Sequence, residues 1–82
     1  MPKLPAIDSD TAAELELLAS YDLHTFQSGV KVRHDAPANL VEAAARLHVK
    51  GLVSAPDGGF LTDLGIEIAE HLQHVLTALR RA

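Results

Sequence analysis

The chain has 82 residues, of which 48% are hydrophobic, and it carries a formal net charge of -4. This length gives room for one hydrophobic core, which excludes a second domain and leaves little space for an enclosed ligand cavity of about 300 Å³. Its apolar runs are shorter than the roughly 18 residues of a membrane span. It also lacks cysteine and a signal-peptide pattern. We therefore expect a soluble, cytoplasmic protein without a membrane-spanning segment.

The charge is distributed unevenly along the chain. Residues 1–36 carry three basic and six acidic side chains, whereas residues 37–82 carry four basic and five acidic ones. Domains that bind DNA normally present a basic surface. The net charge therefore argues against an efficient DNA-binding protein, and the first predicted helix is the acidic one.

The N-terminal residues 1–9 contain two prolines and no periodic pattern. We predict that they form a disordered or loosely docked arm, followed by a single domain over residues 10–82. Thr11 and Glu14 have the spacing of a capping box, in which each side chain bonds to the backbone at the other position. This spacing predicts that the first helix begins at Thr11.

Two sides of this first helix are apolar. Leu15 and Leu18 belong to one stripe at helical spacing, while Leu17 and Tyr21 fall on a second side. The pattern predicts either burial on two faces or a surface that Leu17 and Tyr21 offer to a partner protein.

The segment between the first and the main helix has weaker signals. Residues 22–29 are compatible with a short helix in which Leu23 and Phe26 share a face. Residues 30–33 then alternate apolar and basic side chains, which is typical of a half-buried strand.

The main helix is predicted to start with Asp35 as its cap and Pro37 in its first turn, and to end at Gly51. One face of this helix is apolar and contains Leu40, Ala43, Ala44 and Leu47. The opposite face contains Asn39, Glu42, Arg46 and Lys50. We expect the first face to pack in the core and the second to be exposed.

A hairpin and a last helix complete the chain. Residues 52–54 and 60–61 read as two short strands around the turn signal of residues 56–59. Thr62 is predicted to cap the last helix, whose wide apolar stripe contains Leu64, Ile68, Leu72, Val75 and Leu79. The elements predict an α+β fold that is mainly α, with three to four helices and a small sheet of two to three strands.

The second half of the chain resembles a known architecture. The runs 47–53 (LHVKGLV) and 61–65 (LTDLG), separated by a glycine-containing turn, resemble the pattern of MarR-type winged-helix regulators across recognition helix, wing and final helix. The resemblance covers residues 37–79. The whole chain also resembles a small bacterial family of uncharacterised proteins for which DNA binding is the suggested activity. These resemblances imply a winged-helix-like domain with a DNA-binding or transcription-associated role.

The chain departs from that architecture in two places. A complete winged helix has a full second helix before the recognition helix, whereas residues 22–37 offer only a short helix and a strand. Wings that touch DNA usually carry Arg or Lys, yet no basic residue lies between Lys50 and Arg80. We therefore expect the wing to be structural.

Two functions follow as alternatives. If the protein binds double-stranded DNA, the contact surface should combine Lys31, Arg33, Asn39, Arg46 and Lys50. In that case Asn reads adenine and Arg reads guanine in the major groove. The alternative to DNA contact is that Glu42 and Arg46 form an i,i+4 ion pair on a solvent-exposed helix face. The other function is a protein-interaction module that uses the acidic first helix or the last helix, which would also serve a homodimer.

The histidines of the last helix could belong to a metal site, but their spacing favours Glu–His pairs on the helix surface. Glu67, Glu70, His71 and His74 are neighbours on the last helix. They also form Glu–His pairs at i,i+4, and a catalytic zinc would need a third ligand and a cleft. No nucleophile–base arrangement or phosphate loop accompanies them. We therefore expect no metal, no cofactor and no enzymatic activity, and we expect His48 to pack in the core.

Overall fold

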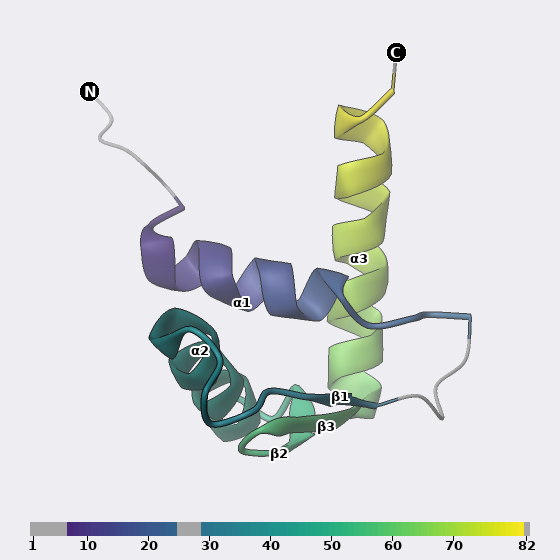
Figure 1. Cartoon of the computed structure of the whole chain (residues 1–82). Helices are drawn as coiled ribbons and strands as arrows, with labels where there is room; N and C mark the ends of the chain where they lie inside the picture. Colours follow the sequence, from purple (N-terminus) through teal and green to yellow (C-terminus); the bar gives the residue numbers. More distant parts are fainter. Residues whose placement is uncertain (1–6, 25–28, 82) are drawn as a thin grey trace.

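The computed structural model describes residues 7–24 and 29–81 and folds them into three helices and a small sheet. The helices are α1 (Ser9–Ala19), α2 (Ala38–Val49) and α3 (Asp63–Leu79), and the strands are β1 (Val30–Lys31), β2 (Val53–Ala55) and β3 (Gly58–Leu61). In Figure 1, α1 lies against α2, the sheet lies below α1 and beside α2, and the C-terminal part of α3 extends beyond α1. The predicted α+β class with a small sheet is confirmed.

The sheet is antiparallel, with the strand order β1-β3-β2. The predicted hairpin of β2 and β3 is present, and β1 adds a third strand by placing Val30 opposite Gly59. Gly58 and Gly59 have φ angles of 117° and 79°. Residues other than glycine rarely adopt such positive φ angles, so the backbone of this turn requires glycine.

Helix α1 begins earlier than the capping box predicted. Asp8 is the N-cap, and its carboxylate accepts a hydrogen bond of 2.7 Å from the backbone N–H of Thr11. The prediction that Thr11 is the cap was wrong, because an equally good capping side chain stands three residues before it. Glu14 is thereby free to face α2 instead of bonding to the start of its own helix.

Helix α2 begins close to the predicted residue but without the predicted cap. Pro37 occupies the N-cap position, and no side chain bonds to the first turn. Asp35 instead accepts a hydrogen bond of 3.3 Å from Nε of Arg33, so its predicted role as the cap was wrong. The end of the helix was predicted correctly, because Gly51 adopts a φ of 80° directly after the C-cap residue Lys50.

Helix α3 starts as predicted. The hydroxyl of Thr62 accepts from the backbone N–H of Gly65 at 3.0 Å and donates to the carbonyl of Gly51 at 2.6 Å. Gly65 lies so close to the carbonyl of Leu52 that a Cβ at this position would collide with it. Thr62 and Gly65 therefore join the start of α3 to the end of α2 and to the sheet.

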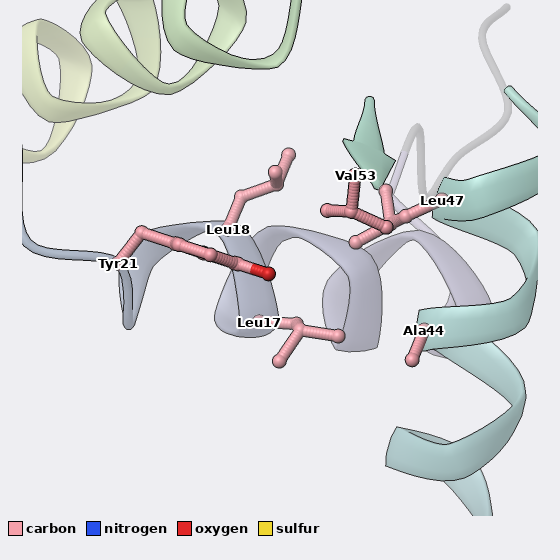
Figure 2. Packing of buried hydrophobic residues seen from close by; sticks show 6 residues of the cluster. All are labelled: Leu17, Leu18, Tyr21, Ala44, Leu47 and Val53. Carbon is pink, nitrogen blue, oxygen red and sulfur yellow. The ribbon is translucent and has the colours of Figure 1, made fainter. Parts of the chain in front are cut away.

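The core lies between α1, α2 and the sheet (Figure 2). It contains Leu17, Leu18, Tyr21, Ala44, Leu47 and Val53. Leu47 and Val53 are 1% and 2% exposed, so the predicted apolar face of α2 does pack inside. His48 is exposed, and the prediction that it packs in the core was wrong because the neighbouring Leu47 takes that place.

Two further expectations meet this structure only in part. Residues 25–28 lie outside the described part of the chain, so the short helix predicted over residues 22–29 stays a prediction. Residues 1–6, most of the predicted arm, lie outside it as well. Within the described ranges, no helix combines the length and the apolar character that crossing a membrane requires.

Candidate functional site

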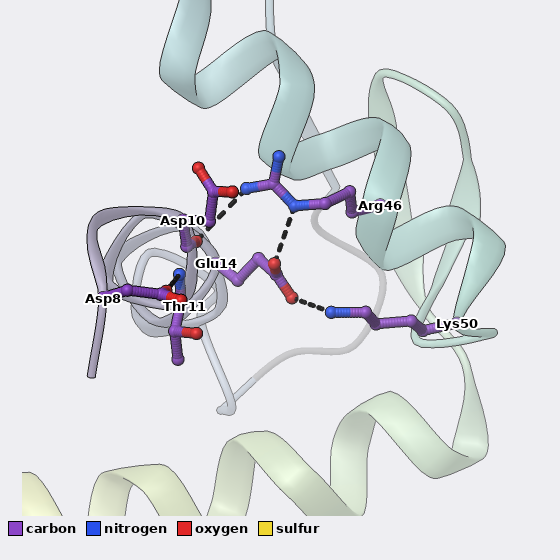
Figure 3. A network of polar contacts seen from close by, with 6 residues as sticks. All are labelled: Asp8, Asp10, Thr11, Glu14, Arg46 and Lys50. Carbon is purple, nitrogen blue, oxygen red and sulfur yellow. Dashed lines mark hydrogen bonds and ion pairs between the residues drawn. The ribbon is translucent and has the colours of Figure 1, made fainter. Parts of the chain in front are cut away.

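Arg46 and Lys50, two of the predicted DNA contacts, are engaged by α1 (Figure 3). Nε of Arg46 donates to the carboxylate of Glu14 at 2.8 Å, and Nζ of Lys50 donates to its other oxygen at 2.5 Å. A second guanidinium nitrogen of Arg46 donates to the carbonyl of Asp10 at 3.2 Å. Arg46 thus points at α1 and does not form the i,i+4 pair with Glu42 that the sequence suggested.

This ion cluster of Glu14, Arg46 and Lys50 is partly shielded from water. The Glu14 side chain is 12% exposed and the Arg46 side chain 31%. Burial by itself would raise the pKa of Glu14, but the hydrogen bonds from Lys50 and Arg46 outweigh it and hold the pKa below its usual value. The bond to Glu14 raises the pKa of Arg46 in turn. Glu14 and Arg46 are therefore charged at neutral pH, and the cluster ties α1 to α2.

The other predicted DNA contacts lie around β1 and at the start of α2. Lys31 is 4.0 Å from the Asp57 carboxylate, and Arg33 is paired with Asp35. The side chains of Lys31 and Arg33 are 78% and 75% exposed. Asn39 is exposed in the first turn of α2. All four predicted cations thus have a carboxylate partner, although the two pairs at β1 are solvated and weak.

The face of α2 that the sequence predicted to be exposed is exposed at Asn39, Glu42 and Lys50 and half-buried at Arg46. A second set of exposed residues at helical spacing on this helix is Ala38, Glu42, Ala45 and Val49. Val49 is 85% exposed. This face carries one carboxylate and no cation, because Arg46 and Lys50 turn towards α1. A recognition helix that enters a DNA groove would present Glu42 and Val49 first.

Leu17 and Tyr21, proposed from the sequence as a partner surface, are core residues. Each is 5% exposed, which agrees with the alternative of burial on two faces. The Tyr21 hydroxyl donates to the carbonyl of Gly59 at 3.0 Å. Burial, with a smaller contribution from Asp57, raises the pKa of Tyr21. Both side chains are thus packed in the core, and the Tyr21 hydroxyl ties the segment directly after α1 to β3. Neither side chain offers a surface to a partner.

The last helix instead exposes apolar side chains. Leu64, Ile68, Val75 and Leu79 are 48%, 36%, 53% and 76% exposed. We name these four residues the α3 stripe. The core-facing side of α3 consists of Gly65 and Ala69, which are buried, and of Leu72 and Leu76, which are half-buried. The wide apolar pattern of the sequence is thus divided between the core and the surface.

A shallow groove of about 340 Å³ adjoins the C-terminal half of α3 on its α1 side. Its walls are mainly apolar and include Leu15 and Ala19 of α1 and Leu72 and Leu76 of α3. The groove and the α3 stripe therefore form neighbouring apolar surfaces. Scattered exposed apolar residues are normal in a soluble protein, but a run along one helix is typical of a binding surface.

The four residues considered for a metal site lie on the flank of α3 that faces away from the core. Glu67, Glu70, His71 and His74 are all exposed. In the part of the chain that the structure describes, no three acidic or histidine side chains gather in a group that could hold a metal ion. Their arrangement is that of a solvated helix flank.

Comparison with known proteins places the chain in a family. Neither the curated proteins nor the solved structures give a match. A family model does match, and it covers residues 5–80, which includes every helix and strand described above. The chain therefore belongs to the family of unknown function DUF5669.

Proposed function

We propose that this protein is a protein-interaction module that binds its partner through the α3 stripe, and that duplex DNA is not its target. The observation that carries this proposal is the exposure of Leu64, Ile68, Val75 and Leu79 along one helix. They are four of the seven large apolar side chains that are exposed in the described residues. Burying such side chains is the main source of free energy in protein association.

The charges support this proposal over DNA binding. A protein that binds duplex DNA releases counterions by placing free Lys and Arg on phosphates. Here Arg46 and Lys50 would first have to leave Glu14, which is nearly buried and would lose both its partners. The cost of leaving a shielded charge unpaired opposes such a rearrangement.

We also propose that the scaffold is related to winged-helix domains. The order α1-β1-α2-β2-β3-α3 and the sheet order β1-β3-β2 suit that proposal. Residues 32–37, between β1 and α2, are all described and contain no helix. The helix that precedes the recognition helix in a complete winged helix is thus absent from this connection, which favours a scaffold that has lost DNA recognition.

Fluorescence anisotropy with labelled mixed-sequence duplex DNA at low and high salt tests the first half of the proposal. We expect no binding at either salt concentration. Binding at low salt that weakens steeply with salt, and that is lost in the Arg46→Ala, Lys50→Ala double variant, would overturn it. Circular dichroism of the double variant controls for its folding.

Site-specific photo-crosslinking in cells tests the second half. A photoreactive residue at Val75 lies on the α3 stripe, whereas one at Thr77 lies on the exposed polar side of the same helix. We expect crosslinked adducts from position 75 and none above background from position 77. Equal yields from both positions, or none from either, would contradict a binding role for the stripe.

A further inference from the structure

We propose that the partner of the α3 stripe is α3 of a second copy of this chain, packed antiparallel about a two-fold axis between His71 and Leu72. This inference rests on the proposed function and adds the identity of the partner and the register of the contact. Closed symmetric dimers use one self-complementary patch on both subunits, so that residue i contacts residue j and j contacts i. The α3 stripe meets this requirement.

The self-complementarity can be read from the positions of the stripe. Leu64 and Leu79 are equally distant in sequence from the point between His71 and Leu72, and so are Ile68 and Val75. When a second α3 is reversed about this point, Leu64 lies opposite Leu79 and Ile68 lies opposite Val75. Each exposed apolar side chain of one copy therefore meets an exposed apolar side chain of the other.

The dipole of α3 favours the same orientation. An antiparallel pair places the N-terminal end of one α3, which carries a partial positive charge, beside the C-terminal end of the other, which carries a partial negative charge. A parallel pair would place like ends together.

The shape of the molecule leaves room for the second helix. Helix α3 has 17 residues, which gives it a length of about 25 Å. In Figure 1 its C-terminal part extends beyond α1. The stripe lies beside the core-facing side of the helix and is exposed from its first to its last turn. Because a single helix face is smaller than a standard interface, we expect a reversible dimer with a dissociation constant of about micromolar order.

Disulfide crosslinking tests the partner and the register together. The chain has no cysteine, so introduced cysteines report only the contact under test. In the proposed register, position 68 lies opposite position 75 of the other copy. Two residues at position 68 are separated by seven residues, or about 10 Å along the axis, which exceeds the roughly 4.4–6.8 Å between the Cα atoms of a disulfide.

The expected result is a disulfide dimer when Ile68→Cys and Val75→Cys proteins are mixed, and little dimer from either protein alone. Thr77→Cys on the polar side serves as the matched control and should remain monomeric. Efficient crosslinking of Ile68→Cys with itself would overturn the antiparallel register. Failure of every combination would overturn the second copy as partner. The proposed function would then still stand if position 75 gave photo-crosslinks to a different protein in cells, and would fail with it if no adduct formed.

Discussion

Replacing Glu14 with Gln removes one charge from the centre of the contact between α1 and α2. The substitution keeps the shape of the side chain but leaves Arg46 and Lys50 without the carboxylate to which both donate. Hydrogen bonds to charged groups contribute about 1.5–3 kcal/mol when they are shielded, whereas exposed ion pairs contribute about 0–1 kcal/mol. Arg46 is about one-third exposed and Lys50 about one-half. We therefore expect a loss of about 1–2 kcal/mol in the free energy of unfolding.

Urea and thermal unfolding, followed by circular dichroism, measure this loss. For a domain of this size, it corresponds to a decrease of about 4–16 °C in Tm. Glu16 provides the matched control, because it is an exposed carboxylate on the same helix with no hydrogen-bond partner among the described residues. Glu16→Gln should change the stability by less than about 0.5 kcal/mol. Equal stabilities of the two variants would refute a structural role for the ion cluster.

The same variant has a defined dependence on pH. Because the pKa of Glu14 is lowered in the folded state, its contribution to stability is present above the ordinary value of 4.5 and is lost as the pH falls through the folded-state pKa. We expect the difference between the wild type and Glu14→Gln to be constant near neutral pH and to shrink in acid. A difference that stayed the same down to the acid transition would contradict the proposed charge on Glu14.

Three further substitutions test contacts that hold the fold. Tyr21→Phe removes the hydroxyl that donates to the Gly59 carbonyl, and urea unfolding should show a loss of about 1 kcal/mol. Gly65→Ala places a Cβ against the carbonyl of Leu52, so thermal unfolding should reveal destabilisation of about 1–3 kcal/mol, in spite of the better helix propensity of Ala. Thr62→Ala removes the cap of α3 and should cost about 1 kcal/mol, whereas Thr62→Ser should retain most of the stability.

The sequence predicted the elements whose signals are local. Gly51 ends α2 and Thr62 begins α3 because a left-handed backbone and an N-cap each depend on one residue and its immediate neighbours. The glycines that predict the hairpin turn are a local signal of the same kind. The start of α1 was missed for the same kind of reason, because Asp8 and Thr11 are both good caps and only the folded chain decides between them.

The surface chemistry was harder to predict, because it depends on residues far apart in the chain. Arg46 and Lys50 follow Glu14 by more than thirty positions, and no helical wheel of α2 alone reveals that α1 supplies their carboxylate. The apolar pattern of α3 was visible, but periodicity does not tell a buried side from an exposed one. The small residues Gly65 and Ala69 were the available signal for the buried side of α3, because they lie where this helix approaches the rest of the molecule.

Sedimentation velocity over a wide range of protein concentrations tests the central claim, that the α3 stripe is an interaction surface for a second copy, most directly. We predict that the wild type shifts from monomer to dimer with increasing concentration. We also predict that Val75→Asp stays monomeric, while Thr77→Asp on the polar side of the same helix behaves as the wild type. Circular dichroism establishes that both variants are folded. A wild type that is monomeric throughout, or a dimer that Val75→Asp leaves intact, would contradict the account.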